Sequence, residues 1–386
     1  MKTEVIIAVR GELPQNLKRT VESIGDSAQV CIVQDGAETA PVAGDVAARV
    51  LRPWQTPRGP GAARHFGIVS SDADLILLCD GHMQFPMGAM QAIEKFHAKR
   101  KGHLTCCRMQ SMDQAGAPMD AQLEGGAWLC LKSREVCDEY WPLSAKWNDP
   151  PRSHGSIGAV MGACYAFRRS WYERIGQPLQ VLQAWGGDEE ILSVSTLLMG
   201  GTVYLLNVPV GHIYAAAYQG RQTSVEEVGR RWANRRAVLE SIPMPDAERA
   251  DLLAWMSQTR RIVNTDVVPV PAACAAVRDV LSRGKRTWPQ LKAAGIVREP
   301  TENEQARFLG SRRRRDDDVR QRNALPPAPR GDVAQIVTRP AEVCKLCGAE
   351  NPFRQVRGTR RLDAIGVAYA RCFRCGHKAQ IRRMLA

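Results

Sequence analysis

The sequence predicts an α/β fold with a mixed, mostly parallel sheet, followed by a helical region and a small zinc-binding domain at the C-terminus. Three observations lead to this prediction. The run Leu75–Cys79 is apolar without interruption, which is typical of a central parallel strand buried on both faces. Strand-like and helix-like segments alternate before this run, in the order of a doubly wound nucleotide-binding half. Near the C-terminus, two CxxC pairs indicate a zinc site.

Short strands and helices alternate over the first 70 residues. Residues 4–9 and 29–33 are predicted strands, and Leu13–Ile24 between them has the spacing of an amphipathic helix. We expect a further short strand to end near Leu51. A loop rich in proline and glycine follows, and it leads into a helix predicted at Ala62–Ser70.

Three later segments continue this alternation. Residues 155–176 begin glycine-rich and extended and end helical, and residues 185–201 read as a loop followed by an apolar helix. A last strand is predicted to end at His212. Beyond about Arg221 the chain becomes helical and charged.

Composition divides the chain into four parts. Around residues 311–332, consecutive like charges and a proline cluster cannot bury enough apolar surface to fold, which indicates a linker. We therefore expect an α/β domain, a helical region, a basic and proline-rich linker and a zinc ribbon at residues 1–220, 221–310, 311–335 and 336–386.

Basic residues concentrate near the C-terminus. Of the 53 Lys and Arg residues, 18 lie in residues 311–386, against 7 of the 40 Asp and Glu residues. Such a localised basic segment is typical of proteins that bind polyanions. The N-terminus shows neither a secretory signal nor a membrane-spanning segment, so we expect a cytoplasmic protein of a bacterium or a virus-infected host cell. The sequence does not predict an oligomeric state.

Four of the twelve cysteines form two knuckles, each followed by glycine. Cys344 and Cys347 are separated by 24 residues from Cys372 and Cys375. Four thiolates in this arrangement hold one tetrahedral Zn²⁺, and the closed coordination makes such an ion structural. A redox pair and spare thiols are the alternatives. The other eight cysteines lie among apolar residues, and we expect buried free thiols there.

An acid and a histidine follow the central apolar run. Asp80 and His82 are two residues apart where the strand ends, and ligands of open α/β sheets bind at the carboxyl ends of the strands. The pair therefore suggests a metal or phosphate site. A capped turn before the next helix is the alternative.

Several separated motifs resemble those of GT-A-fold glycosyltransferases. The stretch PRGPGAARHFGIVSSDADLILLCDGHMQF is similar to their metal-binding segment, and its DxH form resembles the polypeptide N-acetylgalactosaminyltransferases. The pieces GAVMGACYAFRRSWYERIG, WGGDEEI and VGHIY follow in the order found in that family. The resemblance covers about residues 3–215. It implies the GT-A, or nucleotide-diphospho-sugar transferase, fold and transfer of a hexosyl or N-acetylhexosaminyl group from a UDP-sugar.

The resemblance also implies a divalent metal site. Asp80 and His82 match the DxH ligands, and His212 matches the family's third ligand on the last strand. Mixed oxygen and nitrogen donors suit Mn²⁺, with Mg²⁺ as the alternative. Such an ion neutralises the charge that develops on a diphosphate leaving group. An interior histidine is the alternative interpretation of His212.

Further residues correspond to positions that hold the donor. Asp35, at the end of the second strand, matches the acid that binds the base or ribose of the uridine nucleotide, and Arg64 matches a donor-binding residue. Gly162 matches the small residue that lets the backbone approach the sugar. Trp185 begins the WGG-acid loop over the donor. An ordinary turn residue or a helix-surface residue is the alternative for Asp35 and Arg64.

The acid-bearing loop departs from the family pattern, in which an asparagine follows the first acid. Here Asp188 is followed by Glu189 and Glu190, a run that resembles galactosyltransferases that invert the anomeric centre. In an inverting mechanism one carboxylate removes the acceptor's proton, and in a retaining one it positions the groups. We assign this work to Asp188 and Glu189 and expect Glu190 to face solvent at a helix start. The glycines suit a loop that closes over the donor.

The expected acceptor is a hydroxyl on nucleic acid, specifically that of a hydroxymethylated pyrimidine in DNA, as in viruses that decorate their genomes. The basic zinc ribbon favours this acceptor, because neutralised phosphates supply affinity for DNA. The alternatives are a cytosolic transferase acting on protein or glycan, with the ribbon as a partner-docking module, and a non-catalytic nucleic-acid-binding protein. We expect the helical region to pack on the sugar-transfer domain; an acceptor groove is its alternative role.

Overall fold

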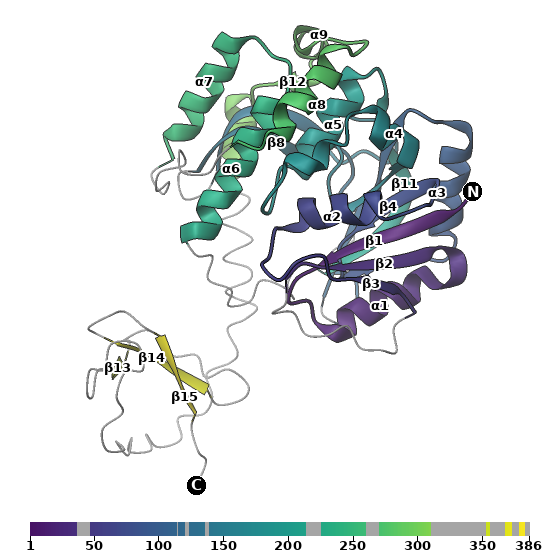
Figure 1. The fold of residues 1–386 in the computed structure, drawn as a ribbon, viewed down its shortest axis with the longest axis vertical. Coiled ribbons are helices and arrows are strands. Elements are labelled where there is room, and N and C mark those ends of the chain that lie inside the picture. Colours follow the sequence, from purple (N-terminus) through teal and green to yellow (C-terminus); the bar gives the residue numbers. More distant parts are fainter. Residues whose placement is uncertain are drawn as a thin grey trace. The chain divides into compact units, whose positions relative to one another are not determined.

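The computed structural model describes residues 1–36, 47–113, 115–119, 123–135, 139–213, 225–259 and 270–309, together with three short strands nearer the C-terminus. The chain divides into two units, Met1–Asp317 and Asp318–Ala386, which are described separately (Figure 1).

Four parallel strands form one half of the main sheet of the first unit. In spatial order they are β3 (Arg49–Leu51), β2 (Gln29–Gln34), β1 (Thr3–Val9) and β4 (Leu75–Cys79). Successive side chains of a strand point to opposite faces. Val5 and Ile7 therefore join one apolar cluster while Ile6 joins the other. All five residues of β4 are buried, which confirms the predicted central strand.

Two helices cover the two faces of this half. Helix α1 (Pro14–Ile24) contributes Leu17 and Val21 to one cluster, and α2 (Pro60–Val69) contributes Ala63 and Ile68 to the other. Helix α2 lies close on the sheet at Gly67, where an added Cβ would come within 2.5 Å of the Ile6 side chain. This close packing fixes the position of Arg64, one turn earlier on the same helix.

The second half of the sheet mixes strand directions. It contains β10 (Cys164–Arg168), β6 (His103–Met112), β11 (Thr202–Ile213) and β5 (Met83–Gln84), and β9 (Gly155–Ser156) pairs with β11. Strand β10 runs antiparallel between β4 and β6, and β11 runs parallel to β6. Strand β5 pairs antiparallel with β11, with Met83 opposite His212. The α/β fold with a mixed, mostly parallel sheet is therefore confirmed.

A second, smaller sheet consists of three strands that the sequence analysis did not predict. Its strands are β7 (Ala127–Glu135), β8 (Glu139–Trp147) and β12 (Val297–Arg298). Strands β7 and β8 form an antiparallel pair, and β12 joins β7 in parallel although it lies more than 160 residues later. A pairing of that sequence separation leaves no local signal.

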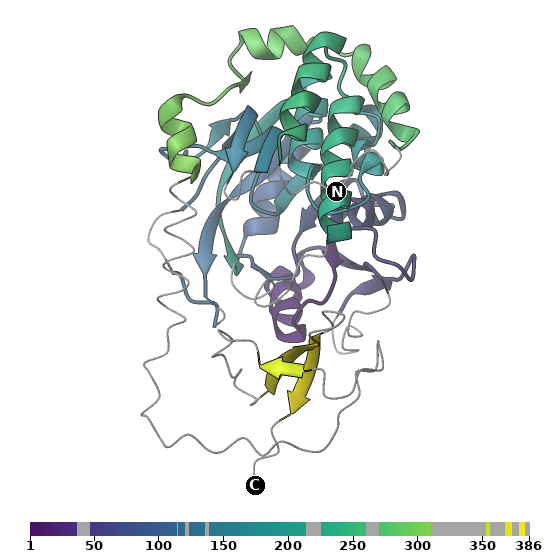
Figure 2. The ribbon, with the colours of Figure 1, turned by 90° about the vertical axis from the view of Figure 1, so that its left-hand side faces the viewer.

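The remaining helices pack against these sheets. They are α3 (Ala89–Lys99), α4 (Arg169–Arg174), α5 (Asp188–Leu198), α6 (Val225–Ser241), α7 (Asp246–Ser257), α8 (Ala273–Ser282), α9 (Trp288–Ala293) and a helix at 302–309. In Figure 2 the green segments, which include α6 to α9, lie mainly in the upper part of the first unit. Val238, Leu252, Val277 and Trp288 are buried in the same apolar cluster as α2. The expected packing of the helical region on the α/β domain is therefore observed.

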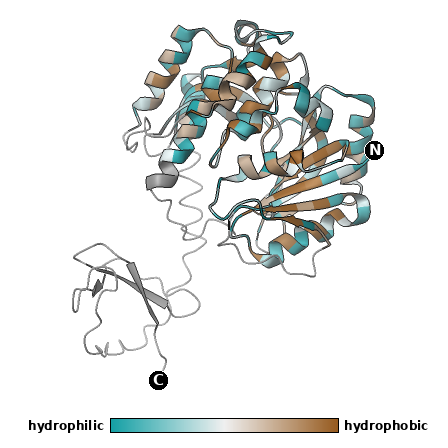
Figure 3. Cartoon of the chain, in the orientation of Figure 1, coloured by the Kyte–Doolittle hydropathy of each residue, from teal (hydrophilic) through white to brown (hydrophobic). Residues whose placement is uncertain are grey.

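The interior is apolar, as Figure 3 shows by the brown central strands and the teal outer face of α7. Seven cysteines are buried free thiols, as predicted: Cys31, Cys79, Cys106, Cys107, Cys130, Cys164 and Cys274. Cys137 lies outside the described residues. Over the part of the chain that the structure describes, the helices are too short or too polar to cross a membrane.

The second unit is described only for three strands. They are β13 (Phe353–Gln355), β14 (Val367–Cys372) and β15 (Lys378–Arg382), and they form an antiparallel sheet. Cys372 ends β14, whereas Cys344, Cys347 and Cys375 lie outside the described residues. The structural Zn²⁺ remains a prediction.

Candidate functional site

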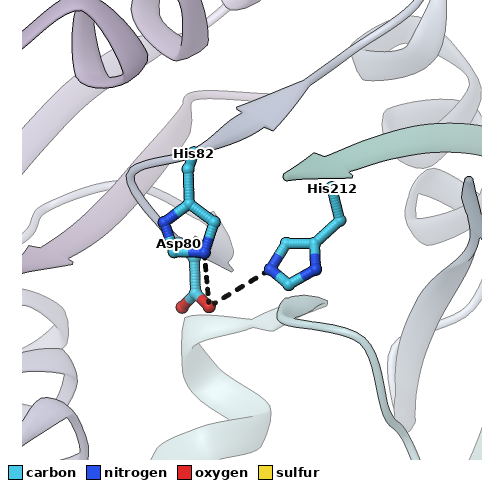
Figure 4. Close-up of side chains that lie close together, drawn as sticks. All are labelled: Asp80, His82 and His212. Carbon is cyan, nitrogen blue, oxygen red and sulfur yellow. Dashed lines mark ion pairs between the residues drawn. The ribbon is translucent and has the colours of Figure 1, made fainter. Parts of the chain in front are cut away.

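Three potential metal ligands meet at the carboxyl edge of the main sheet. Asp80 follows β4 and His82 precedes β5, while His212 lies on β11. The pairing of β5 with β11 brings His212 beside this turn, and the backbone N–H of Ile213 donates to the His82 carbonyl at 3.1 Å. Figure 4 shows both imidazole rings directed at the Asp80 carboxylate, with Oδ2 lying 3.8 Å from His82 Nε2 and 3.6 Å from His212 Nε2.

This donor set fits a divalent cation. One potential ligand atom from each of the three side chains lies within 4.8 Å of the other two, which is close enough for all three to bind one ion. Two imidazole nitrogens and one carboxylate oxygen suit first-row ions such as Mn²⁺. The histidines are buried, but 30% of the Asp80 side chain is exposed, which leaves an approach for further oxygen ligands.

The two oxygens of Asp80 have different partners. Oδ2 faces the imidazoles, and Oδ1 accepts a hydrogen bond from Arg64 Nη2 at 2.7 Å. Burial raises the pKa of Asp80, but the neighbouring His212 imidazole and the charge of Arg64 outweigh burial and hold the pKa below its usual range. The Asp80 side chain is therefore an ionised carboxylate.

Glu12 orients His82, a role that the sequence analysis missed. Its Oε2 lies 2.7 Å from His82 Nδ1, and its Oε1 accepts from the backbone N–H of Leu13 at 3.1 Å. A carboxylate that accepts from Nδ1–H leaves Nε2 free to bind a metal. Burial lowers the pKa of His82, but the hydrogen bond to Glu12 and the charge of Asp80 raise it above its usual value.

A sequence signal for Glu12 exists. Glu12, Asp35 and Asp80 each follow a parallel strand of the same sheet, and the carboxyl ends of such strands meet at one edge. The position of Glu12 in the first strand-to-helix loop therefore predicts that it lies near the DxH turn.

Arg64 joins the metal-site carboxylate to the acid loop. This buried guanidinium donates to Asp80 through Nη2 and to Asp188 through Nη1, and it lies 5.6 Å from the centre of the Tyr165 ring. Burial lowers the pKa of Arg64, but the charges of Asp188 and Asp80 more than offset burial and raise it. A permanent positive charge at this position suits the binding of a diphosphate.

The acid run opens helix α5. Gly187 precedes the helix with a φ of 94°, and Asp188 is its first residue. The next residue, Glu189, accepts a hydrogen bond from the Tyr165 hydroxyl at 2.6 Å. Burial and the negative charges of Asp188 and Glu190 raise the pKa of Glu189 to about 8. Glu189 therefore changes between its protonated and its ionised form at a pH of about 8.

The expectation that Glu190 faces solvent is wrong. Only 5% of Glu190 is exposed, and its Oε1 accepts from the backbone N–H of Ala145 on β8 at 3.0 Å. Helix α5 is covered by the β7–β8 sheet on this side, so the third acid points inward. Burial raises the pKa of Glu190, while the nearby Arg235 lowers it.

Asp35 is buried in the loop that leads into α2. Its carboxylate accepts from Trp54 Nε1 at 2.7 Å and from the backbone N–H groups of Arg58 and Gly59 at 2.6 Å and 2.8 Å. In the structure Asp35 therefore holds this loop. Its contact with a nucleotide remains a prediction.

Gly162 and Trp185 have contrasting surroundings. Gly162 has a φ of 95°, and a Cβ there would lie 2.4 Å from Met109 Cγ and 2.9 Å from Trp147 Cη2, so a larger residue does not fit. Trp185 is 43% exposed, and the Arg231 guanidinium lies 5.1 Å from the centre of its ring. Its exposed ring surface can contact a bound ligand.

Comparison with known proteins finds a family match for the part of the chain that holds Asp80 and His82. Residues 4–176 match the family described as Glycosyl transferase family 2. The matched residues make up less than half of the chain, and the sheet is that of a GT-A fold. No curated protein matches the sequence.

A solved structure supports the fold. GalNAc-T7, in a crystal structure with UDP, GalNAc and Mn²⁺, is similar with a TM-score of 0.59 and 16% sequence identity, over 76% of this chain and 56% of that chain. This chain thus spans just over half the length of GalNAc-T7. Weaker similarity exists to S. aureus TarS 1-349 in complex with UDP-GlcNAc, with a TM-score of 0.41 and 12% identity over 68% of this chain and 72% of that one.

The orientation of His82 by Glu12 predicts a metal-binding phenotype. Glu12→Ala should weaken Mn²⁺ binding about 10- to 100-fold, because a ligating histidine that loses its carboxylate partner is less basic and less well oriented. Titration calorimetry or the Mn²⁺ electron paramagnetic resonance signal measures this affinity. Glu22→Gln, an exposed acid on α1, is the matched control. Unchanged Mn²⁺ affinity in Glu12→Ala would show that Glu12 does not support metal binding.

Proposed function

We propose that this protein is a metal-dependent glycosyltransferase that moves a sugar from a UDP-sugar to a hydroxyl acceptor. The observation that carries the proposal is the convergence of Asp80, His82 and His212, with Arg64 joining Asp80 to the acid loop. The family 2 domain supports glycosyl transfer. The UDP-sugar is proposed because GalNAc-T7, which shares the fold, was crystallised with UDP, GalNAc and Mn²⁺.

Each residue at the edge of the sheet has a distinct role in this proposal. Asp80, His82 and His212 would hold the cation, Mn²⁺ in preference to Mg²⁺ because two ligands are nitrogen. When bound, the cation supplies positive charge for the diphosphate leaving group. Arg64 adds a fixed positive charge beside it. Asp188 can accept a hydrogen bond from a sugar or acceptor hydroxyl while it remains paired with Arg64.

Loss of the metal carboxylate should strongly reduce turnover of the donor. We expect Asp80→Ala to lower Mn²⁺-dependent UDP-sugar hydrolysis at least about 100-fold, because several kcal/mol of charge stabilisation are lost and each 1.4 kcal/mol is about a factor of ten. Released UDP is measured for a panel of UDP-sugars, with circular dichroism to establish folding. Asp72→Ala, an exposed acid, should keep wild-type rates. Hydrolysis that survives in Asp80→Ala would contradict the proposal.

Glu189 is the proposed proton acceptor for the incoming hydroxyl. Of the two acids assigned to catalysis, Asp188 is paired with Arg64, whereas Glu189 has the Tyr165 hydroxyl as hydrogen-bond donor. A general base works best when its pKa lies near the operating pH. The raised pKa of Glu189 meets this condition. Removal of the proton by a carboxylate corresponds to inversion at the anomeric carbon.

The pH dependence tests this role of Glu189. Transfer should rise with pH and level off above about 8, because the base acts only when deprotonated. Glu189→Gln should lower kcat about 10²- to 10⁴-fold. Since the folded state holds the proton more tightly than the unfolded state, wild-type stability should fall relative to Glu189→Gln as the pH rises from about 4.5 to about 8.

Rates and thermal melting curves of both proteins from pH 5 to 9 measure these effects, with the exposed Glu173→Gln as control. A flat pH–rate profile together with a retained anomeric configuration would assign Glu189 a positioning role instead.

The proposed acceptor is a hydroxymethylated pyrimidine in DNA. The support is the excess of basic residues in 311–386, since neutralising phosphates gives affinity without sequence preference. A hydroxymethyl group at the pyrimidine C5 position projects into the major groove, where a protein can reach it without full extrusion of the base. The zinc ribbon is the proposed DNA-binding module.

Two measurements test the acceptor. With Mn²⁺ and UDP-sugars, DNA containing hydroxymethylpyrimidine should gain sugar, detected by mass spectrometry of its nucleosides, whereas unmodified DNA should not. DNA affinity should fall log-linearly with salt, and Arg371→Gln with Arg382→Gln should reduce that slope by about one per lost phosphate contact. Arg283→Gln, an exposed arginine of the first unit, is the control. Sugar transfer to peptides together with no transfer to DNA would show that the acceptor is a protein.

A further inference from the structure

We propose that Asn234 on α6 is a positioning residue that holds residues 183–187, the part of the acid loop before α5, in the conformation that places Asp188 beside Arg64. This inference rests on the proposed function for its catalytic consequence. The loop contact itself is a property of the folded chain and is independent of any substrate.

The Asn234 amide makes three hydrogen bonds with the backbone of the loop. Its Oδ1 accepts from the Gln183 N–H at 2.7 Å, and its Nδ2 donates to the carbonyls of Ala184 and Gly186 at 2.8 Å and 2.9 Å. Asn234 is only 2% exposed, so these bonds are shielded from water. The carboxamide has both the acceptor and the two donor hydrogens that this set of groups requires.

The loop adopts a conformation that needs such support. Gly186 and Gly187 have φ values of 90° and 94°, in the left-handed region that favours glycine. An added Cβ at Gly59 would lie within 2.5 Å of the Ala184 backbone, so the loop before α2 packs directly against the acid loop. The glycines therefore allow the backbone to adopt this turn, and the hydrogen bonds of the Asn234 amide stabilise it.

Other residues on the same face of α6 contact the same two loops. Arg231 lies over the Trp185 ring, and Arg230 donates to the Pro57 carbonyl at 3.4 Å. A Cβ at Gly187 would lie 3.0 Å from Val238 Cγ2. Positions 231, 234 and 238 follow helical spacing and share one face. Helix α6 thus supports the acid loop, and both lie outside residues 4–176, which match the family.

The consequence for catalysis follows from the chain direction. Asp188 comes directly after Gly187, so any displacement of the loop moves the Asp188 carboxylate relative to Arg64 and the start of α5 relative to Tyr165. A misplacement of about 1 Å at a reacting group can cost about 10²-fold in rate. The cation ligands and Arg64 lie on other elements and should stay in place.

The test uses the full-length protein with Asn234→Asp, which keeps the shape and the acceptor for Gln183 but places a carboxylate oxygen against two carbonyl oxygens. We expect faster hydrogen–deuterium exchange in the peptide that spans residues 182–192. We also expect kcat for sugar transfer to fall about 10- to 100-fold, with the KM for the UDP-sugar within about threefold of wild type. Ser241→Ala, a buried residue on α6 that bonds to the Ala237 carbonyl, controls for general weakening of the helix.

Gly186→Ala provides a second variant in case Asn234→Asp fails to fold. An added Cβ at Gly186 has no neighbour within 4 Å, so this change perturbs only the backbone of the loop, and it should raise exchange and lower kcat in the same direction. Unchanged loop exchange in Asn234→Asp and in Gly186→Ala would overturn the inference. So would a rise in KM with unchanged kcat, or equal effects in Ser241→Ala. Absence of UDP-sugar turnover in the wild type would defeat the proposed function, while loop exchange would still decide the role of Asn234.

Discussion

The site depends on the buried guanidinium of Arg64. It binds a carboxylate at the end of β4 and another at the start of α5, so it couples the metal-binding edge of the sheet to the acid loop. A buried guanidinium is costly unless carboxylates accept its hydrogen bonds, and neighbouring carboxylates repel unless a cation lies between them. The two carboxylates therefore lower the cost of burying Arg64, and Arg64 reduces the repulsion between the two carboxylates. The same pairing directs Asp80 Oδ2 away from Arg64 and toward the two imidazoles, where a second positive charge can bind.

Much of the fold could be predicted from the sequence because its signals are local. The uninterrupted apolar run of β4 and the helical spacing of α1 are each visible within the residues of the element itself, and both elements lie where they were expected. Strands β7 and β12 gave no such signal, since their pairing joins distant parts of the chain. The site divides in the same way. Asp80 and His82 are two residues apart, but the approach of His212 depends on the register of β5 against β11, which the sequence does not encode locally.

The residues that sequence reasoning missed or misplaced act through tertiary contacts. Glu190 follows two acids at a helix start, a pattern typical of a solvated turn, yet β8 covers it and supplies a backbone donor. Asn234 lies within a run of arginines on a helix whose partner loop is about 50 residues earlier. The glycines of the acid loop suggested flexibility, whereas the structure uses their left-handed conformations in a turn held by a buried amide. Glycine content alone does not distinguish these two uses, because both require the same freedom of φ.

Under the proposed function, the distribution of charge separates two tasks, which are binding of the sugar donor and binding of DNA. Outside residues 311–386, the remaining 35 basic residues nearly balance the remaining 33 acidic ones. A catalytic unit rich in exposed positive charge would bind DNA phosphates where the diphosphate of the donor should bind, because both are phosphate anions. In the proposed arrangement, selectivity for the diphosphate comes from one buried arginine and a cation site, while attraction to the polymer comes from the C-terminal segment. Salt screens exposed charges far more than buried ones, so ionic strength would control the encounter with DNA and leave donor binding largely unchanged.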